Sequence, residues 1–299
     1  MRTKIILSII ILFFGTQIFS QNLTLSNRQF FRAGVNPATF LNANDLNVFV
    51  LYNNQYAGFD GHPNTELFDF SLVFNNHKFG VTIINDVINF DKMQDIKARY
   101  SRKFLLSDNN KSFSLGLGMG VFNRNLSKDQ LVFERPNDPL SYQDYRKTYF
   151  DYDVGVEVQL NNFAAGFSTT HLGKVFSEVF NETYVEHFNL YGQYLFQLNG
   201  PFRIMPNVLV RYWEKSYLVD AGAIVFYKSV WLGASYSGYH ELTVNTGAEL
   251  TKNIMFGYAF KANMNSDVLG AFTSGTHEIF LNFSLNRDYR DVLTPRYID

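Results

Sequence analysis

The chain has 299 residues and a formal net charge of −1, which gives no reason to expect a nucleic-acid partner. It contains no Cys, which excludes disulfide staples and also a lipoprotein anchor, because that anchor is attached to a Cys at the cleavage point. Aromatic residues make up 17% of the chain, with 31 Phe and 18 Tyr beside 2 Trp, and this density favours β-strands.

The first feature in chain order is an apolar N-terminal run with the organisation of a signal peptide. Arg2 and Lys4 precede the run, and small residues lead to a cleavage expected after Ser20. A membrane helix is the alternative, but the run is short for that purpose and follows basic residues. We therefore interpret residues 1–20 as a secretory signal peptide, whose removal takes away two positive charges and changes the formal charge from −1 to −3.

From about residue 46 onwards, apolar and polar residues alternate with the period of a β-strand. The clearest segments are KSFSLGLGMGVF (111–122) and TYFDYDVGVEVQL (148–160), and similar alternation occurs over 187–198, 242–250, 253–261 and 275–285. Weaker candidates lie at about 46–56, 67–75, 78–87, 95–104, 162–170, 203–213, 217–227 and 229–238. Together they predict about 14 strands, an even number of the kind expected for a single-chain outer-membrane barrel.

The connections between these segments contain residues that tolerate tight reversals. Examples are Asn75-Asn76, Asn161-Asn162 and Asn199-Gly200-Pro201. The longest irregular stretch, residues 124–147, is charged and contains two Pro, so we predict a large surface loop there. No helical stripe of useful length follows the signal peptide.

The alternation is compatible with two all-β architectures. In a soluble sandwich the apolar face points to a shared core, whereas in a membrane barrel it points to lipid and the polar face surrounds a lumen. Three features favour the barrel. Strands of about 9–11 residues match a tilted membrane span, aromatic residues recur near the segment ends, and the signal peptide exports the chain. We therefore predict an all-β, antiparallel transmembrane barrel of about 14 strands over residues 45–285.

Three glycines alternate along the polar face of one strand, at Gly116, Gly118 and Gly120. Glycine inside a strand weakens it unless the sheet must bend or another group approaches closely. The run therefore indicates strong barrel curvature, an occupied lumen, or simple relief of crowding inside a narrow barrel. It is not a dinucleotide fingerprint, because the spacing differs and no helix follows.

Four segments contain a set of motif positions in a fixed order. QFFRAGVNPATFLN contains Asn36, Pro37 and Ala38, and LYNNQYAGFDGHPNT contains Gln55, Gly58, Gly61, Pro63 and Thr65. YDVGVEVQLNNFAAGFSTTHL contains Asp153, Gly155, Gly166, Ser168, His171 and Leu172, and SGTHEIFLNFSL contains Gly275, His277, Glu278 and Ile279. In order and spacing these segments resemble the PorP/SprF family, the type IX secretion system membrane proteins of Bacteroidota. Asn53 and Tyr56 replace the Arg and Trp that are usual in this family, which is typical of a divergent member.

The resemblance implies an outer-membrane barrel that helps to export or surface-anchor large proteins carrying a C-terminal sorting domain. It also implies partners, namely periplasmic secretion components, or a secreted cargo or gliding adhesin. The family has no known catalytic residues, so the motif positions above are candidate site residues of unknown role.

Three groups of polar residues bear on whether the chain binds a metal or performs catalysis. The six His form neither an i, i+4 pair nor a short cluster, so we predict no metal and no cofactor. Asp151, Asp153 and Glu157 share the inward face of one strand; paired carboxylates can perform acid–base chemistry, but we favour lumen hydration and charge pairing with basic residues of another strand, namely Lys97, Arg99 and Lys103. Ser168 and His171 are three residues apart on a strand and therefore face opposite ways, which argues against a catalytic dyad.

These observations give a domain plan and a functional hypothesis. Residues 1–20 are the signal peptide, 21–44 a periplasmic segment, 45–285 the barrel and 286–299 a C-terminal extension. The leading hypothesis is a non-enzymatic secretion component of the outer membrane that binds partner proteins. A passive porin for small solutes is the alternative, and an outer-membrane hydrolase is a third candidate.

Overall fold

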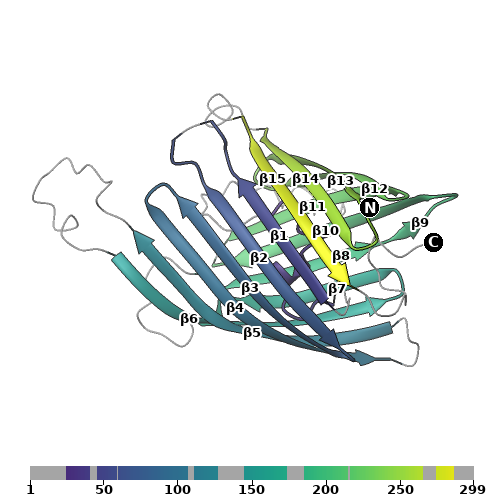
Figure 1. Ribbon diagram of the computed structural model, residues 1–299, viewed down its shortest axis with the longest axis horizontal. Coiled ribbons are helices and arrows are strands. Elements are labelled where there is room, and N and C mark those ends of the chain that lie inside the picture. The colour runs from purple at the N-terminus through teal and green to yellow at the C-terminus, as the bar shows by residue number, and fades with distance from the viewer. Residues whose placement is uncertain are drawn as a thin grey trace, which may run out of the picture.

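The computed structural model describes residues 25–40, 46–58, 60–106, 111–126, 145–173, 185–214, 216–264 and 274–285 (Figure 1). These residues form one 3₁₀ turn, η1 (Arg32–Gly34), and fifteen strands. The strands are β1 (Leu46–Asn54), β2 (Asn64–Phe74), β3 (His77–Ile88), β4 (Asp91–Leu105), β5 (Lys111–Leu126), β6 (Tyr145–Leu160), β7 (Phe163–Thr170), β8 (His187–Tyr194), β9 (Phe196–Gln197), β10 (Phe202–Trp213), β11 (Ser216–Tyr227), β12 (Val230–Ser237), β13 (Glu241–Glu249), β14 (Ile254–Asn263) and β15 (Thr276–Leu285). None of the helical structure in these ranges is long and apolar enough to cross a membrane.

The strands form a closed antiparallel barrel. Apart from β8 and β9, consecutive strands pair with each other, and pairing of β1 with β15 closes the ring. β8 and β9 both pair with β10 and are separated only by Leu195, so they occupy one position in the wall. The barrel therefore has 14 strand positions, which confirms the predicted fold and strand number. Closure leaves no unpaired sheet edge in lipid, where backbone groups would lack hydrogen-bond partners.

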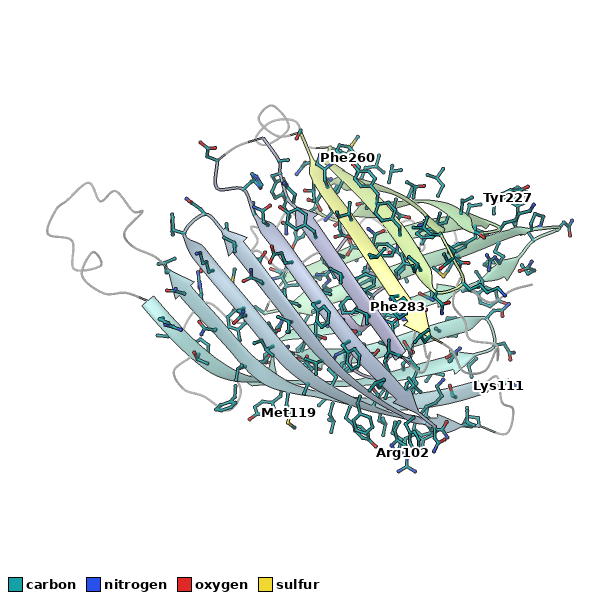
Figure 2. All side chains as sticks on the ribbon, in the orientation of Figure 1. Arg102, Lys111, Met119, Tyr227, Phe260 and Phe283 are labelled. Atoms are coloured by element: carbon teal, nitrogen blue, oxygen red, sulfur yellow. The ribbon has the colours of Figure 1, made fainter. Side chains whose placement is uncertain are left out.

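The two faces of the wall differ as the alternation predicted. On β5, Leu117 is 53% exposed and Met119 59% exposed, whereas Ser114 on the opposite face is 3% exposed. Figure 2 shows Met119 projecting from the outer surface of the barrel. Large apolar side chains on the outside of nearly every strand are expected for a surface covered by acyl chains. The apolar face thus points outward.

The lengths of the connections distinguish the two ends of the barrel. The end that carries the first residue of β1 and the last residue of β15 has short connections, which are 75–76, 106–110, 161–162, 198–201, 228–229 and 250–253. The opposite end has the three longest, 127–144, 171–186 and 264–275. We call these the turn end and the loop end; the turn end lies at the lower right of Figure 1, where the arrow of β15 points. Outer-membrane barrels keep short turns in the periplasm and longer loops outside the cell.

The predicted loop over 124–147 is shorter than expected at both sides. β5 continues to Leu126 and β6 begins at Tyr145, because the two strands remain paired along their full lengths. Residues 127–144 lie outside the described residues, as do the predicted signal peptide, residues 41–44 and the C-terminal extension.

Residues 25–40 lie inside the barrel, and we call them the plug. We predicted that residues 21–44 form a periplasmic segment ahead of the barrel, but Phe30 and Phe31 are each 4% exposed and pack on aromatic residues of the wall. Phe31 stacks on Phe49 at 4.8 Å between ring centroids, and Phe30 lies 4.8 Å from Trp231. The physical reason is the width of a 14-strand barrel, whose interior must be filled by more than the side chains of its own wall.

Candidate functional site

The plug is fastened near its centre by a carboxylate on β6. Glu157 is 2% exposed and accepts hydrogen bonds from the Nε and Nη2 of Arg32, at 3.2 and 3.0 Å. The same carboxylate accepts the backbone N–H of Phe40 at 3.3 Å and the hydroxyl of Tyr191. Burial disfavours the charged form of Arg32, but the attraction of Glu157 outweighs this effect and raises the pKa of the guanidinium. Glu157 thus joins two parts of the plug to the wall.

A second carboxylate, on β15, holds the beginning of the plug. Glu278 is fully buried and accepts the backbone N–H groups of Ser26 and Asn27 at 2.9 and 2.7 Å, and the side-chain amide of Asn27 at 2.9 Å. Next to it, Arg28 donates to the backbone carbonyl of Asp220 at 3.2 Å. Burial lowers the pKa of Arg28, and the Asp220 carboxylate acts in the opposite direction. Family-motif position Glu278 therefore contacts the plug directly.

The Asn36-Pro37-Ala38 motif forms the tip of the plug, close to the turn end. The Asn36 side-chain amide donates to the carbonyl of Val156 at 2.9 Å, while its oxygen accepts the N–H of Ala38 at 2.9 Å and so closes a tight local turn. Ser101 donates to the carbonyl of Pro37 at 2.6 Å. Wall side chains thus satisfy backbone groups that the irregular plug cannot pair internally.

Three glycines of the wall form a cradle for this tip. A Cβ atom on Gly116 would collide with backbone atoms of Pro37 and Ala38, and one on Gly155 would collide with the Asn36 side chain. At Gly166 an added Cβ would lie 2.4 Å from the Tyr191 side chain of the wall and 2.7 Å from the Asn36 amide nitrogen. Only a residue without a side chain permits this approach. Gly155 and Gly166 are family-motif positions, and the cradle gives them a physical role.

The cradle also decides between the interpretations of the glycine run on β5. At Gly116 the close neighbour is the plug, which agrees with an occupied lumen. At Gly120 the nearest atom is instead the backbone carbonyl oxygen of Ile96 on the neighbouring strand β4. At Gly118 the nearest atoms belong to the side chain of Asp153. The three positions therefore have different causes.

A cluster of charged side chains lies beside the plug, where β4 and β6 face the lumen. Lys97 Nζ lies 2.6 Å from Asp151, 2.9 Å from Asp153 and 3.3 Å from Asp95. His171, the residue after β7, places its Nδ1 2.8 Å from Asp151 and donates its backbone N–H to Asp153 at 3.0 Å. The predicted charge pairing of the β6 carboxylates is therefore present at Lys97.

The other two predicted cations have different partners. Arg99 pairs with Asp69 of β2, and Lys103 lies 4.7 Å from the ring centroid of Phe40. Glu157 is paired with Arg32 of the plug, a partner that the sequence analysis did not identify. We predicted that water hydrates the acidic face of β6. The plug covers part of this face, so the carboxylates there are buried instead.

The candidate metal ligands and the candidate nucleophile have other partners in this geometry. Ligand atoms of Asp95, Asp151 and His171 lie within 4.8 Å of one another, but the ammonium of Lys97 lies among them and supplies the positive charge. Ser168 donates to the carbonyl of Val35 in the plug, while His171 contacts Asp151. The two residues considered as a dyad thus have separate partners.

The remaining motif positions lie at the loop end. Gln55, Gly58, Gly61 and Pro63 belong to the connection between β1 and β2, which is held by the Gln55 N–H to Pro63 carbonyl bond of 2.8 Å and by contact with Gly275. Gly61 and Gly275 have positive φ values of 78° and 96°, which favour glycine.

Two motif side chains near the loop end pair with residues of neighbouring strands. Thr65 donates to Asp86 at 2.6 Å, and His277 Nδ1 lies 2.8 Å from the Tyr258 hydroxyl. These positions shape the rim at the loop end.

A cavity of about 170 Å³ remains on the loop side of the plug. It is lined by Leu25 at the beginning of the plug and by charged and aromatic side chains of the wall, among them Arg99, His187 and Trp213. The tip motif lies on the other side of the plug, towards the turn end. The cavity therefore lies between the plug and the loop half of the wall.

Comparison with known proteins agrees with this architecture. The family model described as type IX secretion system membrane protein PorP/SprF matches residues 19–283. No curated protein sequence matches the chain. Among solved structures, the outer membrane protein Omp33 of Acinetobacter baumannii is 12% identical with a TM-score of 0.50, and 81% of this chain and 98% of that one are covered. A deletion mutant of the monoaromatic hydrocarbon channel TodX is 10% identical with a TM-score of 0.51, covering 86% and 94%.

Identities this low show the fold alone, an outer-membrane barrel, whereas the family match spans almost the entire described chain. The four segments that carry the resemblance in the sequence also fall within the matched range. The chain belongs to the PorP/SprF family of type IX secretion system membrane proteins and is a β-barrel of the outer membrane.

Proposed function

We propose that this barrel is a non-enzymatic component of the type IX secretion system that helps the secretion or surface attachment of sorting-domain proteins, such as gliding adhesins. The observation that carries the proposal is the plug. A lumen filled by residues 25–40 does not suit a wide passage, so the barrel acts by binding partners at its two ends.

The contacts of the plug support a stable closure. Removing the plug would break the hydrogen bonds that the Glu157 and Glu278 carboxylates accept from it. Hydrogen bonds to charged groups each contribute about 1.5–3 kcal/mol. Displacement would therefore be unfavourable unless a partner supplied equivalent donors.

A non-enzymatic role is supported by the engagement of the polar residues in the described part of the chain. The β6 carboxylates are neutralised by Lys97 and Arg32, and Ser168 binds a plug carbonyl. Each of these groups has a structural partner that explains its presence in the lumen.

The proposal is tested by co-purification from crosslinked envelopes. The protein with a C-terminal affinity tag should recover periplasmic secretion components or a sorting-domain protein, and an equally tagged, unrelated outer-membrane barrel should not. Recovery of neither class of partner would contradict the proposal.

A passive porin is the second candidate, supported by the cavity on the loop side and by the similarity to a structure named as a channel. Planar-bilayer recordings separate the two functions. The proposed partner-binding barrel should show little steady current, because residues 25–40 occupy the lumen. A large, stable conductance of the wild-type protein would favour the porin instead.

A further inference from the structure

Aromatic side chains gather on the outer surface near the turn end. Phe104 and Phe113 stack across β4 and β5 with ring centroids 4.7 Å apart, and Phe202 and Tyr227 meet across β10 and β11 at 4.7 Å. These strands lie on different parts of the wall, so the rings belong to a belt and not to one patch. Aromatic belts mark the level at which acyl chains meet headgroups.

Basic side chains lie directly beside these rings. The guanidinium carbon of Arg102 is 5.0 Å from the Phe104 ring centroid, and Lys228 Nζ is 5.7 Å from that of Tyr227. Both basic residues are exposed, and Figure 2 shows Arg102 and Lys111 along the edge of the barrel that forms its turn end. We call Arg102, Lys111, Lys228 and Lys252 the basic belt.

Negative charge is scarce at the same level. The described residues of the turn-end connections include Lys228 and Lys252 but no carboxylate. Glu249, which ends β13, continues the register of the lumen-facing residues Glu241, Thr243 and Asn245 and so does not belong to the outer face. Among the described residues of the turn-end connections, the charged side chains are therefore positive.

We propose that the basic belt binds the phosphate groups of phospholipid headgroups in the leaflet at the turn end. Long basic side chains place their apolar stems along the wall and their charges at headgroup level, where phosphate is the complementary group. Arg102 follows the lipid-facing residues Ile96, Ala98 and Tyr100 in the register of β4, so it projects sideways into the membrane surface. An acidic protein docked beneath the barrel would need cations that point off its end. The belt fixes the depth and direction of the barrel in the membrane.

The chain offers a matched control on the same strand. Lys92 is exposed and lies on the same outward face of β4 as Arg102, but at the loop end. Loss of this charge removes one cation of the outer surface without touching the basic belt. Neither side chain contacts the plug.

The test uses the purified full-length protein, native mass spectrometry and added phosphatidylglycerol, with phosphatidylcholine as the zwitterionic comparison. Arg102→Gln combined with Lys228→Gln should weaken phosphatidylglycerol binding by about five-fold for each removed charge, the factor expected for one basic residue at an anionic surface. Lys92→Gln should bind as the wild type does. Heat-modifiable gel mobility verifies that each variant is a folded barrel.

The possible outcomes are distinct. Equal phosphatidylglycerol binding by the wild type and the double variant would overturn the proposal, and so would an equal loss in Lys92→Gln, which would indicate a general charge effect. Unchanged lipid binding together with loss of a crosslinked periplasmic protein would replace it with protein docking. Since the lipid readout does not involve secretion, it can succeed or fail independently of the proposed function.

Discussion

Replacing Gly116 with Ala is expected to displace the tip of the plug from the wall of the barrel. A Cβ atom at this position of β5 would lie far inside van der Waals contact with backbone atoms of Pro37 and Ala38. Backbone atoms cannot rotate away as the end of a flexible side chain can. The tip must therefore move by about 1 Å to restore a normal carbon–carbon separation.

The contacts of the tip set the size of the effect. Ser101 donates to the Pro37 carbonyl at 2.6 Å, and Ser114 donates to the Ala38 carbonyl at 2.7 Å. Each buried hydrogen bond that is lost costs about 1 kcal/mol, and overpacking adds about 1–3 kcal/mol. We therefore expect Gly116→Ala to lower the free energy of unfolding by about 3–5 kcal/mol if both hydrogen bonds are broken.

Urea unfolding in lipid vesicles measures this loss, with Gly118→Ala as the control on the same strand and face. The three atoms nearest to an added Cβ at Gly118 all belong to the side chain of Asp153, the closest at 3.2 Å. The chain has no Cys, so Thr39→Cys provides a single buried thiol beside the tip, and a maleimide should modify it faster in the Gly116→Ala background. Equal unfolding free energies for the two Ala variants, with unchanged thiol reactivity, would refute the cradle.

Three further substitutions test other parts of the structure. Glu157→Gln leaves the buried guanidinium of Arg32 without a carboxylate and should cost about 3–5 kcal/mol in urea unfolding; an unchanged midpoint would contradict the ion pair. Lys97→Met removes the cation shared by two β6 carboxylates, so stability should fall by about 3–5 kcal/mol at neutral pH and by less in acid, where protonated carboxylates need no counter-charge; a loss independent of pH would count against this reasoning. Leu117→Arg, in the middle of the lipid-facing side of β5, should reduce the free energy of folding into vesicles by about 2–4 kcal/mol, whereas Asn123→Arg near the loop end should cost about 0–1 kcal/mol; equal costs would mean that this face does not contact lipid.

Several features of the barrel could be predicted because they depend on local pattern. Successive side chains of a strand point to opposite faces, so the alternation over 148–160 puts Asp151, Asp153 and Glu157 on one face. The strand lengths and the predicted export favoured a barrel and so made that face the inner one, where all three residues are buried. The number of strands followed from counting such segments. The same alternation places Lys97 on the inner face of its own strand, β4. It was therefore expected as a partner of the carboxylates on the inner face of β6.

The site could be predicted only in part. Asn36, Gly155, Gly166 and Glu278 were recognised as positions of a family motif, but nothing in their spacing indicated that they meet around one segment. Arg32 was not recognised, because a single basic residue in an irregular segment has no periodic signal. The one available hint was that Arg32 lies shortly before the Asn36-Pro37-Ala38 motif.

The sequence by itself determined which side of each strand is apolar and how many strands there are, because those properties are set by neighbours within about ten residues. Only the tertiary structure decided that residues 25–40 enter the lumen, since that placement depends on partners distant in the chain. Asn27 and Glu278 are 251 residues apart and meet inside the ring that the pairing of β15 with β1 closes. Closing the ring creates an interior volume and places carboxylates inside it. The plug fills that volume and donates hydrogen bonds to those carboxylates.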